Sequence, residues 1–150
     1  MRRALEVAML LGKRFEGLSL VPYLCPAKVP TIGRGTVYKP DGSKVTMQDV
    51  PITVKTADEW LNITLQRDCL PAAIKYTPAL VGDQESIGAI ADFIYNLGAS
   101  RYKTSTLRRR LNNQEWDEAQ HEIMRWTRAN GRVLKGLQLR RSAEAEYLPK

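Results

Sequence analysis

The chain has 150 residues, of which 43% are hydrophobic and 26% charged, as expected for a globular domain that buries a core and not for a disordered chain. Its net charge of +7 is concentrated in residues 101–141, which hold 11 Lys or Arg and 4 Asp or Glu. This excess predicts a polyanionic partner: nucleic acid, anionic lipid or an acidic cell-wall polymer. Two cysteines and one histidine exclude a disulfide framework and a Cys/His zinc site.

The first expected element is an amphipathic helix over residues 4–16, with Leu5, Ala8 and Phe15 on one face. A signal peptide is the alternative, but Glu6 interrupts the apolar run and no small-residue cleavage site follows it. The run is also shorter than the ~20 apolar residues that span a bilayer. We therefore expect synthesis in the cytoplasm without an export signal.

Residues 20–50 have a different character, because prolines and glycines recur throughout them and break any helix. The segment TIGRGTVY, residues 31–38, alternates like a short strand. The segment KPDGSK, residues 39–44, predicts a hairpin turn around Asp41 and Gly42. Together these patterns indicate a small β-lobe.

Helices are expected again from Thr56, which the segment TADE marks as the N-cap of a capping box completed by Glu59. Apolar residues then recur on one helix face up to Cys69, which predicts that this thiol is buried. Pro71 is expected to end or kink the helix. In a reducing cytosol both cysteines should be free thiols.

The segment of residues 84–97 is apolar nearly all round, which predicts a helix at the centre of a helical lobe. Gly98 is expected to stop this helix as the residue after its C-cap. Three shorter helices should follow: a basic one capped by residues 104–106, one within residues 114–126, and the last within residues 136–147.

The predicted fold class is α+β in a single domain. A small β-lobe covers about residues 17–55, and a larger helical lobe covers about residues 56–150 together with the helix of residues 1–16. Such an arrangement offers a cleft between the two lobes.

Glu16 ends the first predicted helix, and Cys25 and Thr31 follow it at spacings of nine and six residues. A helix-end glutamate is most often only a solvated surface residue. However, Glu16, Cys25 and Thr31-Ile32-Gly33 resemble the signature of the phage lysozymes, the endolysins of glycoside hydrolase family 24 from T-even and lambdoid phages. That signature is a Glu, eight residues, an Asp or sometimes a Cys, five residues, then Thr, an apolar residue and Gly.

The resemblance extends over nearly the whole chain. Residues 93–112, FIYNLGASRYKTSTLRRRLN, are similar to the family's Asn-x-Gly and Ser-Thr-Leu segments before a basic helix. Residues 125–148 are similar to its C-terminal segment, in which a Trp precedes a glycine, an Arg pair and a Glu. The resemblance implies a lysozyme-like fold and an N-acetylmuramidase that cleaves peptidoglycan as a monomer, with no metal and no cofactor.

Glycoside cleavage needs a proton for the leaving oxygen and stabilisation of an oxocarbenium-like centre, usually by two carboxyl groups. The resemblance assigns Glu16 as the general acid, and burial should raise the pKa of such an acid so that it keeps its proton near neutral pH. It assigns Cys25 and Thr31 to positioning or activating a water molecule.

A cysteine where the family usually has Asp leaves three interpretations open. A free thiol has a pKa of ~8.5, so that only a few per cent is thiolate at neutral pH. Cys25 can remain neutral and shape the water site, can have a lowered pKa and act as a thiolate, or can be a nucleophile that forms a covalent glycosyl intermediate. The neutral thiol is the preferred interpretation.

Further residues match family positions near the glycan: Tyr95, Asn96 and Thr106 as substrate-binding candidates. The alternative is that Tyr95 is a core aromatic and Thr106 a first-turn helix residue. Arg140 and Arg141 fall where the family has a basic pair close to the catalytic Glu.

Two other functions compete with a lysozyme. A lytic transglycosylase would use the same acid but let a hydroxyl of the sugar attack in place of water. A basic helical nucleic-acid-binding module is suggested by residues 101–141, but no helix-turn-helix or aromatic-basic pattern supports it. For a lysozyme held in the host cytoplasm, access to the periplasm and wall would depend on a membrane-permeabilising partner, a holin.

Overall fold

The structure, a computed structural model, describes residues 1–150, and they form two compact units. The smaller unit holds residues 12–64, and the larger unit holds residues 1–11 and 65–150. This division differs from the predicted lobes mainly because the helix that follows the β-segment belongs to the smaller unit.

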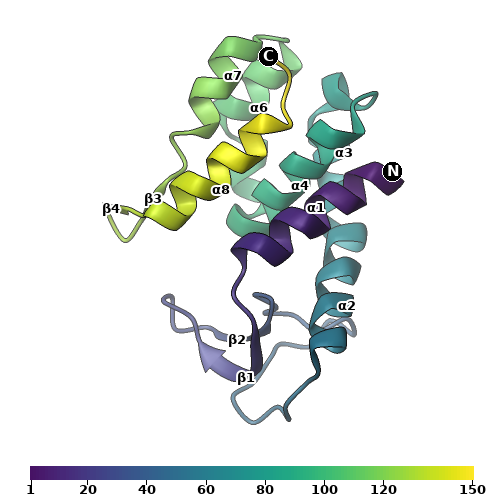
Figure 1. Cartoon of the computed structure of the whole chain (residues 1–150), viewed down its shortest axis with the longest axis vertical. Coiled ribbons are helices and arrows are strands. Elements are labelled where there is room, and N and C mark those ends of the chain that lie inside the picture. Colours follow the sequence, from purple (N-terminus) through teal and green to yellow (C-terminus); the bar gives the residue numbers. More distant parts are fainter. The chain divides into compact units, whose positions relative to one another are not determined.

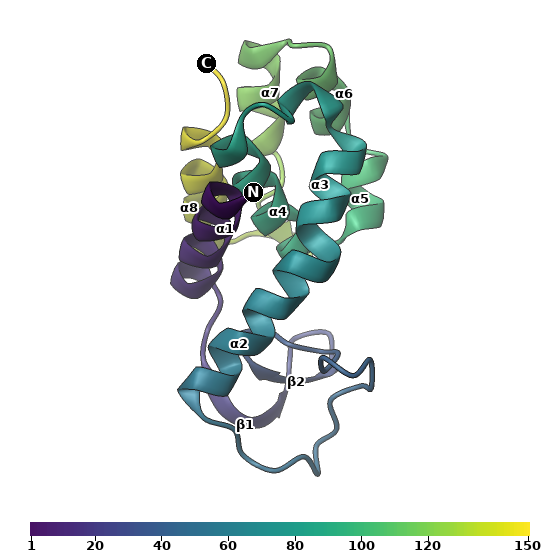
Figure 2. The same cartoon turned by 90° about the vertical axis from the view of Figure 1, so that its right-hand side faces the viewer.

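The smaller unit is built on helix α2 (Val54–Thr64). Strand β1 (Ser19–Leu24) pairs antiparallel with β2 (Pro30–Gly33), and β2 packs against α2 (Figure 2). The last turn of α1 (Arg2–Phe15) also belongs to this unit. The presence of both helices and paired strands confirms the predicted α+β class.

Two glycines let the chain approach α2 closely. A Cβ atom on Gly12 would lie 3.2 Å from a side-chain carbon of Leu61, and one on Gly33 would lie 3.3 Å from the Cβ of Ala57. Ala57 and Leu61 are one helical turn apart and both fully buried. One face of α2 therefore holds both the end of α1 and the end of β2.

The turn predicted at residues 39–44 is confirmed. The backbone N–H of Gly42 donates to the carbonyl of Lys39 over 2.9 Å, and Tyr38 and Lys44 form an isolated antiparallel bridge. Gly42 has a φ of +89°, which an L-residue adopts only at a cost.

The prediction that Thr56 caps the next helix is wrong by one turn. The helix begins at Val54, and the hydroxyl of Thr53 accepts the backbone N–H of Thr56 over 3.0 Å. Thr53 offers the same capping hydroxyl three residues earlier, and the longer helix gains backbone hydrogen bonds such as that from Ala57 N–H to the Thr53 carbonyl, 2.9 Å.

Helix α4 (Gln84–Leu97) lies at the centre of the larger unit, side by side with α3 (Leu70–Tyr76) (Figures 1 and 2). Its side chains are buried from Ser86 to Ile94, as the sequence predicts, and Gly98 ends it with a φ of +97°. The other elements of the unit are the π-helical turn η1 (Leu65–Cys69), α3 (Leu70–Tyr76), the 3-10 turn η2 (Pro78–Leu80), α5 (Ala99–Lys103), α6 (Thr106–Asn112), α7 (Trp116–Ile123), β3 (Arg128–Ala129), β4 (Arg132–Val133) and α8 (Lys135–Glu146).

The chain remains helical through Pro71, contrary to the expectation that this proline ends the helix. It occupies the second position of α3, directly after the π-helical turn. A proline inside a helix lacks a donor and clashes with the carbonyl four residues earlier, and a wider turn at that point relieves both problems. Cys69 ends the π-helical turn and is buried, as predicted.

The hairpin β3–β4 was not predicted, although the sequence contains a signal for it. Asn130 and Gly131 form its turn with φ values of +53° and +76°. Asn-Gly is the preferred pair for a two-residue turn in which both residues have positive φ.

The contact between α1 and α4 leaves no room for a side chain at Gly88, which gives a stability prediction. A Cβ there would lie 2.4 Å from the carbonyl oxygen of Ala4 and 2.8 Å from the Cβ of Val7. Gly88→Ala should lower the free energy of unfolding by about 1–3 kcal/mol, because this overlap outweighs a gain of about 1 kcal/mol in helix propensity. Urea denaturation would measure the loss.

Gly136 in α8 is the matched control, since nothing lies within 4 Å of a Cβ built there. Gly136→Ala should leave the stability unchanged or raise it by up to about 1 kcal/mol. Equal effects of the two substitutions would contradict the prediction.

Candidate active site

All three predicted catalytic residues lie in the smaller unit. Glu16 is half-buried and directly follows α1, where its backbone N–H donates to the carbonyl of Gly12 over 2.9 Å. Cys25 is half-buried and directly follows β1, and Thr31 is a buried residue of β2. The acid is therefore held by a helix end and the other two residues by a strand pair.

The loop between the two strands brings Cys25 and Thr31 together. The backbone N–H of Cys25 donates to the carbonyl of Val29 over 3.1 Å, and the N–H of Lys28 donates to the carbonyl of Cys25 over 2.7 Å. The hydroxyl of Thr31 donates to the same Val29 carbonyl over 2.9 Å and is also within hydrogen-bonding reach of the Cys25 sulfur. One hydroxyl proton therefore has two acceptors.

The pKa of the Cys25 thiol is lowered by this loop. The backbone N–H of Val29 has the largest effect, that of Ala27 and the hydroxyl of Thr31 add to it, and partial desolvation opposes them. These donors stabilise the charged sulfur. The neutral thiol, the thiolate and the nucleophile all remain predictions for Cys25.

Tyr23 lies near enough to Glu16 and Cys25 to sense their charges. It lies opposite Thr31 in the strand register, and burial followed by the negative charges of Glu16 and Cys25 raises the pKa of its phenol. The sequence analysis did not single out Tyr23, although its position two residues before Cys25 is a usable signal.

The three substrate-binding candidates lie in the larger unit. The side-chain oxygen of Asn96 accepts a hydrogen bond of 2.8 Å from Arg141, so this amide also holds an arginine in place. Tyr95 is half-buried at the end of α4. Thr106 is the first residue of α6, as the alternative interpretation expected.

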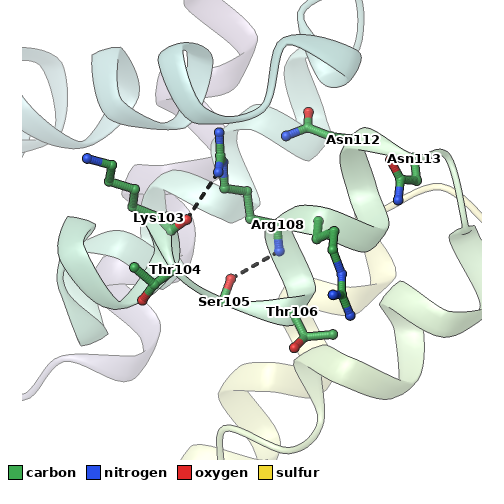
Figure 3. Close-up of a pocket in the computed structure, with 8 residues that line it drawn as sticks. Lys103, Thr104, Ser105, Thr106, Arg108, Asn112 and Asn113 are labelled. Atoms are coloured by element: carbon green, nitrogen blue, oxygen red, sulfur yellow. Dashed lines mark hydrogen bonds between the residues drawn. The ribbon is translucent and has the colours of Figure 1, made fainter.

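Thr106 also lines a surface cavity of about 350 Å³ within the positively charged region of residues 101–141 (Figure 3). Lys103, Arg108 and Asn112 are among the other lining residues. Arg108 donates to two backbone carbonyls, those of Tyr76 at 2.7 Å and Lys103 at 3.2 Å, so its charge is held in place without an acid. This cavity can attract an acidic polymer.

Arg140 and Arg141 belong to a buried ion network in the larger unit. Arg140 binds Asp92 through two hydrogen bonds of 2.9 and 2.7 Å, and Arg141 binds Glu144 at 2.7 Å. All four side chains are almost completely buried. Burial first, and then the charge of Asp92, raises the pKa of Glu144 well above its usual range.

The profile of the phage lysozyme family matches residues 13–144, which include the whole candidate site. The chain belongs to this family. A related endolysin, from Acyrthosiphon pisum secondary endosymbiont phage 1, is 32% identical over 143 residues, covering 93% of this chain and 92% of the relative.

Solved structures agree with this assignment. P22 lysozyme superposes with a TM-score of 0.74 at 29% identity, covering 93% of both chains. The muramidase domain of SpmX from Asticaccaulis excentricus superposes with a TM-score of 0.71 at 27% identity, covering 93% of this chain and 92% of that one. The lysozyme-like fold is therefore confirmed.

None of the helices of this phage lysozyme combines the length and the apolar character needed to cross a bilayer. No group of three His, Cys, Asp or Glu side chains is arranged to hold a metal ion.

The lowered pKa of Cys25 gives a direct prediction for its alkylation. The rate of reaction with iodoacetamide should rise at a pH below the ~8.5 of an ordinary cysteine, because the thiolate is the reactive form. Thr31→Val removes one donor to the sulfur and should shift the profile back to higher pH. Mass spectrometry of the labelled protein across pH measures both profiles.

Cys69 should remain unlabelled in the folded protein, since burial followed by the charges of Asp68 and Asp92 raises its pKa to about 12. Cys25→Ser should therefore take up no label. A wild-type profile centred at or above pH ~8.5 would contradict the lowered pKa.

Proposed function

We propose that this phage lysozyme is an endolysin that hydrolyses the β-1,4 bond between N-acetylmuramic acid and N-acetylglucosamine in peptidoglycan. The observation that carries the proposal is that Glu16, Cys25 and Thr31 lie in one compact unit, with Cys25 and Thr31 linked through the loop at Val29, within the region that matches the family. The muramidase domain among the structural relatives supports the same substrate.

In the proposed reaction Glu16 donates its proton to the glycosidic oxygen as the bond to the anomeric carbon breaks. Positive charge then develops on the sugar ring, and a water molecule attacks the anomeric carbon. The hydroxyl of Thr31 orients this water, and the Cys25 thiolate accepts its proton. Return of that proton to Glu16 through solvent restores the starting state.

The hydrogen bonds of Thr31 suit either protonation state of Cys25. Thr31 can donate its proton to the Val29 carbonyl or toward the sulfur, so its oxygen remains an acceptor for the attacking water in either state. A neutral Cys25 that shapes the water site and Cys25 as a nucleophile remain the alternatives, and a glycosyl adduct on Cys25 detected by mass spectrometry would establish the nucleophile.

The basic cavity at α5 and α6 supports attraction to the acidic wall polymer. We further propose that the enzyme acts as a monomer and waits in the host cytoplasm until a holin opens the way to the periplasm and wall. Lysis in cells that express the endolysin with and without a holin would test this dependence.

A turbidity assay on cells with a permeabilised outer membrane tests the activity itself. We expect the turbidity to fall, and chromatography of the products to show glycan fragments with reducing ends. Anhydro-muramic ends would show a lytic transglycosylase instead, and unchanged turbidity with intact glycan chains would overturn the proposal.

A further inference from the structure

The side chain of Asp58, on α2, joins two segments of the smaller unit. Its carboxylate accepts a hydrogen bond from the Nε of Arg34 and lies 3.6 Å from the Nζ of Lys13. The Nη1 of Arg34 also donates to the backbone carbonyl of Lys13 over 3.4 Å. We call these three residues the Asp58 clamp.

The two joined segments are those that carry the candidate catalytic residues. Lys13 lies in the last turn of α1, three residues before Glu16. Arg34 directly follows β2, three residues after Thr31. The clamp therefore connects the segment that carries Glu16 with the segment that carries Thr31. It does so by hydrogen bonds from a charged donor, which are stronger than hydrogen bonds between neutral groups.

The adjacent face of α2 packs closely against both segments. A Cβ built on Gly33 would lie 3.3 Å from Ala57, which is next to Asp58, and one built on Gly12 would lie 3.2 Å from Leu61, one turn later. Apolar contacts limit how closely each segment approaches α2, but they do not direct either segment along the helix. The directional hydrogen bonds of the clamp supply that constraint.

The interactions of the Asp58 carboxylate with Arg34 and Lys13 should also persist at the pH of the reaction. Partial burial tends to raise the pKa of Asp58, but the hydrogen bond and charge of Arg34, together with Lys13, outweigh it and lower the pKa. An acid whose pKa is lowered by folding keeps its interactions at any pH above its pKa in the unfolded chain. It loses them only as the pH falls through its pKa in the folded protein.

We propose that Asp58 and Arg34 are positioning residues that set the separation between Glu16 and the Cys25–Thr31 pair. This inference rests on the proposed function. The clamp acts through the segments it joins, so its loss should slow the chemical step without weakening substrate binding. A displacement of about 1 Å in a catalytic group can cost a hundredfold in rate.

Steady-state kinetics of Asp58→Asn on soluble peptidoglycan fragments tests the proposal. We expect kcat to fall by about 10- to 100-fold, with KM within about twofold of the wild type. The matched control is Asp49→Asn, which removes a 3.1 Å ion pair with Lys39 in the same unit. The side chains are 25% and 22% exposed in that pair, and 13% and 26% exposed in the Arg34–Asp58 pair.

Two further variants separate positioning from folding. Asp58→Glu keeps the charge but moves it by one methylene group, and it should give an intermediate loss of kcat with a melting temperature near that of the wild type. The exchange Arg34→Asp with Asp58→Arg should recover part of the rate that Asp58→Asn loses.

Equal kcat values for Asp58→Asn, Asp58→Glu and Asp49→Asn would overturn the inference, as would an effect confined to KM. A wild type that leaves peptidoglycan intact would instead overturn the proposed function. The two failures are thus distinguishable in one set of assays.

Discussion

Glu16→Gln should reduce peptidoglycan hydrolysis by about 10²- to 10⁴-fold, the contribution of a positioned general acid. The amide has nearly the same shape as the protonated carboxyl group but cannot deliver a proton to the leaving oxygen. Since Glu16 is only half-buried at a helix end, the substitution should leave the fold intact. The initial rate of turbidity loss, compared at equal concentrations of folded protein, measures the effect.

Glu59→Gln is the control for this experiment, because Glu59 is an exposed carboxylate of α2 in the same unit. It should retain wild-type activity and stability. A Glu16→Gln enzyme with more than about a tenth of wild-type activity would contradict the role of Glu16 as general acid.

Asp92→Ala should lower the free energy of unfolding by about 3–5 kcal/mol, because it leaves the buried Arg140 without its bidentate carboxylate. Glu144 is the other acid near this guanidinium, at 3.9 Å from its Nε, which is a poorer geometry. Urea denaturation monitored by circular dichroism measures the loss.

Glu85→Ala is the comparison for Asp92→Ala, since it removes an ion pair of the same length, 2.7 Å, from the surface of the same unit. The partners Arg3 and Glu85 are 50% and 48% exposed, so water compensates both charges after the substitution. Its cost should stay below about 1 kcal/mol. Similar losses for the two variants would contradict the importance of the buried network.

The sequence predicted most of the helices because their signals are local. The apolar run of α4, the glycine after it, and the serine that caps α6 all act within a few residues. The errors arose where two local signals competed, as with Thr53 and Thr56, or where backbone geometry adapted to a residue, as with Pro71. The Asn130-Gly131 hairpin was missed although its signal is present.

The residues of the candidate site were predicted only from the resemblance to the phage lysozyme signature. Glu16, Cys25 and Thr31 followed from a spacing that resembles the family signature; all three lie in the smaller unit, and their catalytic roles stay a prediction. The contact of Asp58 with Arg34 joins residues 24 positions apart, and no local pattern indicates such a pair. Apart from the Thr31 hydroxyl, the donors to the Cys25 sulfur are backbone groups, whose positions cannot be read from a sequence.

The contrast between the two thiols has a practical consequence. Cys25 is accessible and has a lowered pKa, whereas Cys69 is buried and its pKa is raised to about 12. A maleimide fluorophore or a nitroxide spin label would therefore attach to the native chain at one place, Cys25 in the smaller unit, without any engineered cysteine. Substrate arrival could then be followed in real time from the signal of that probe.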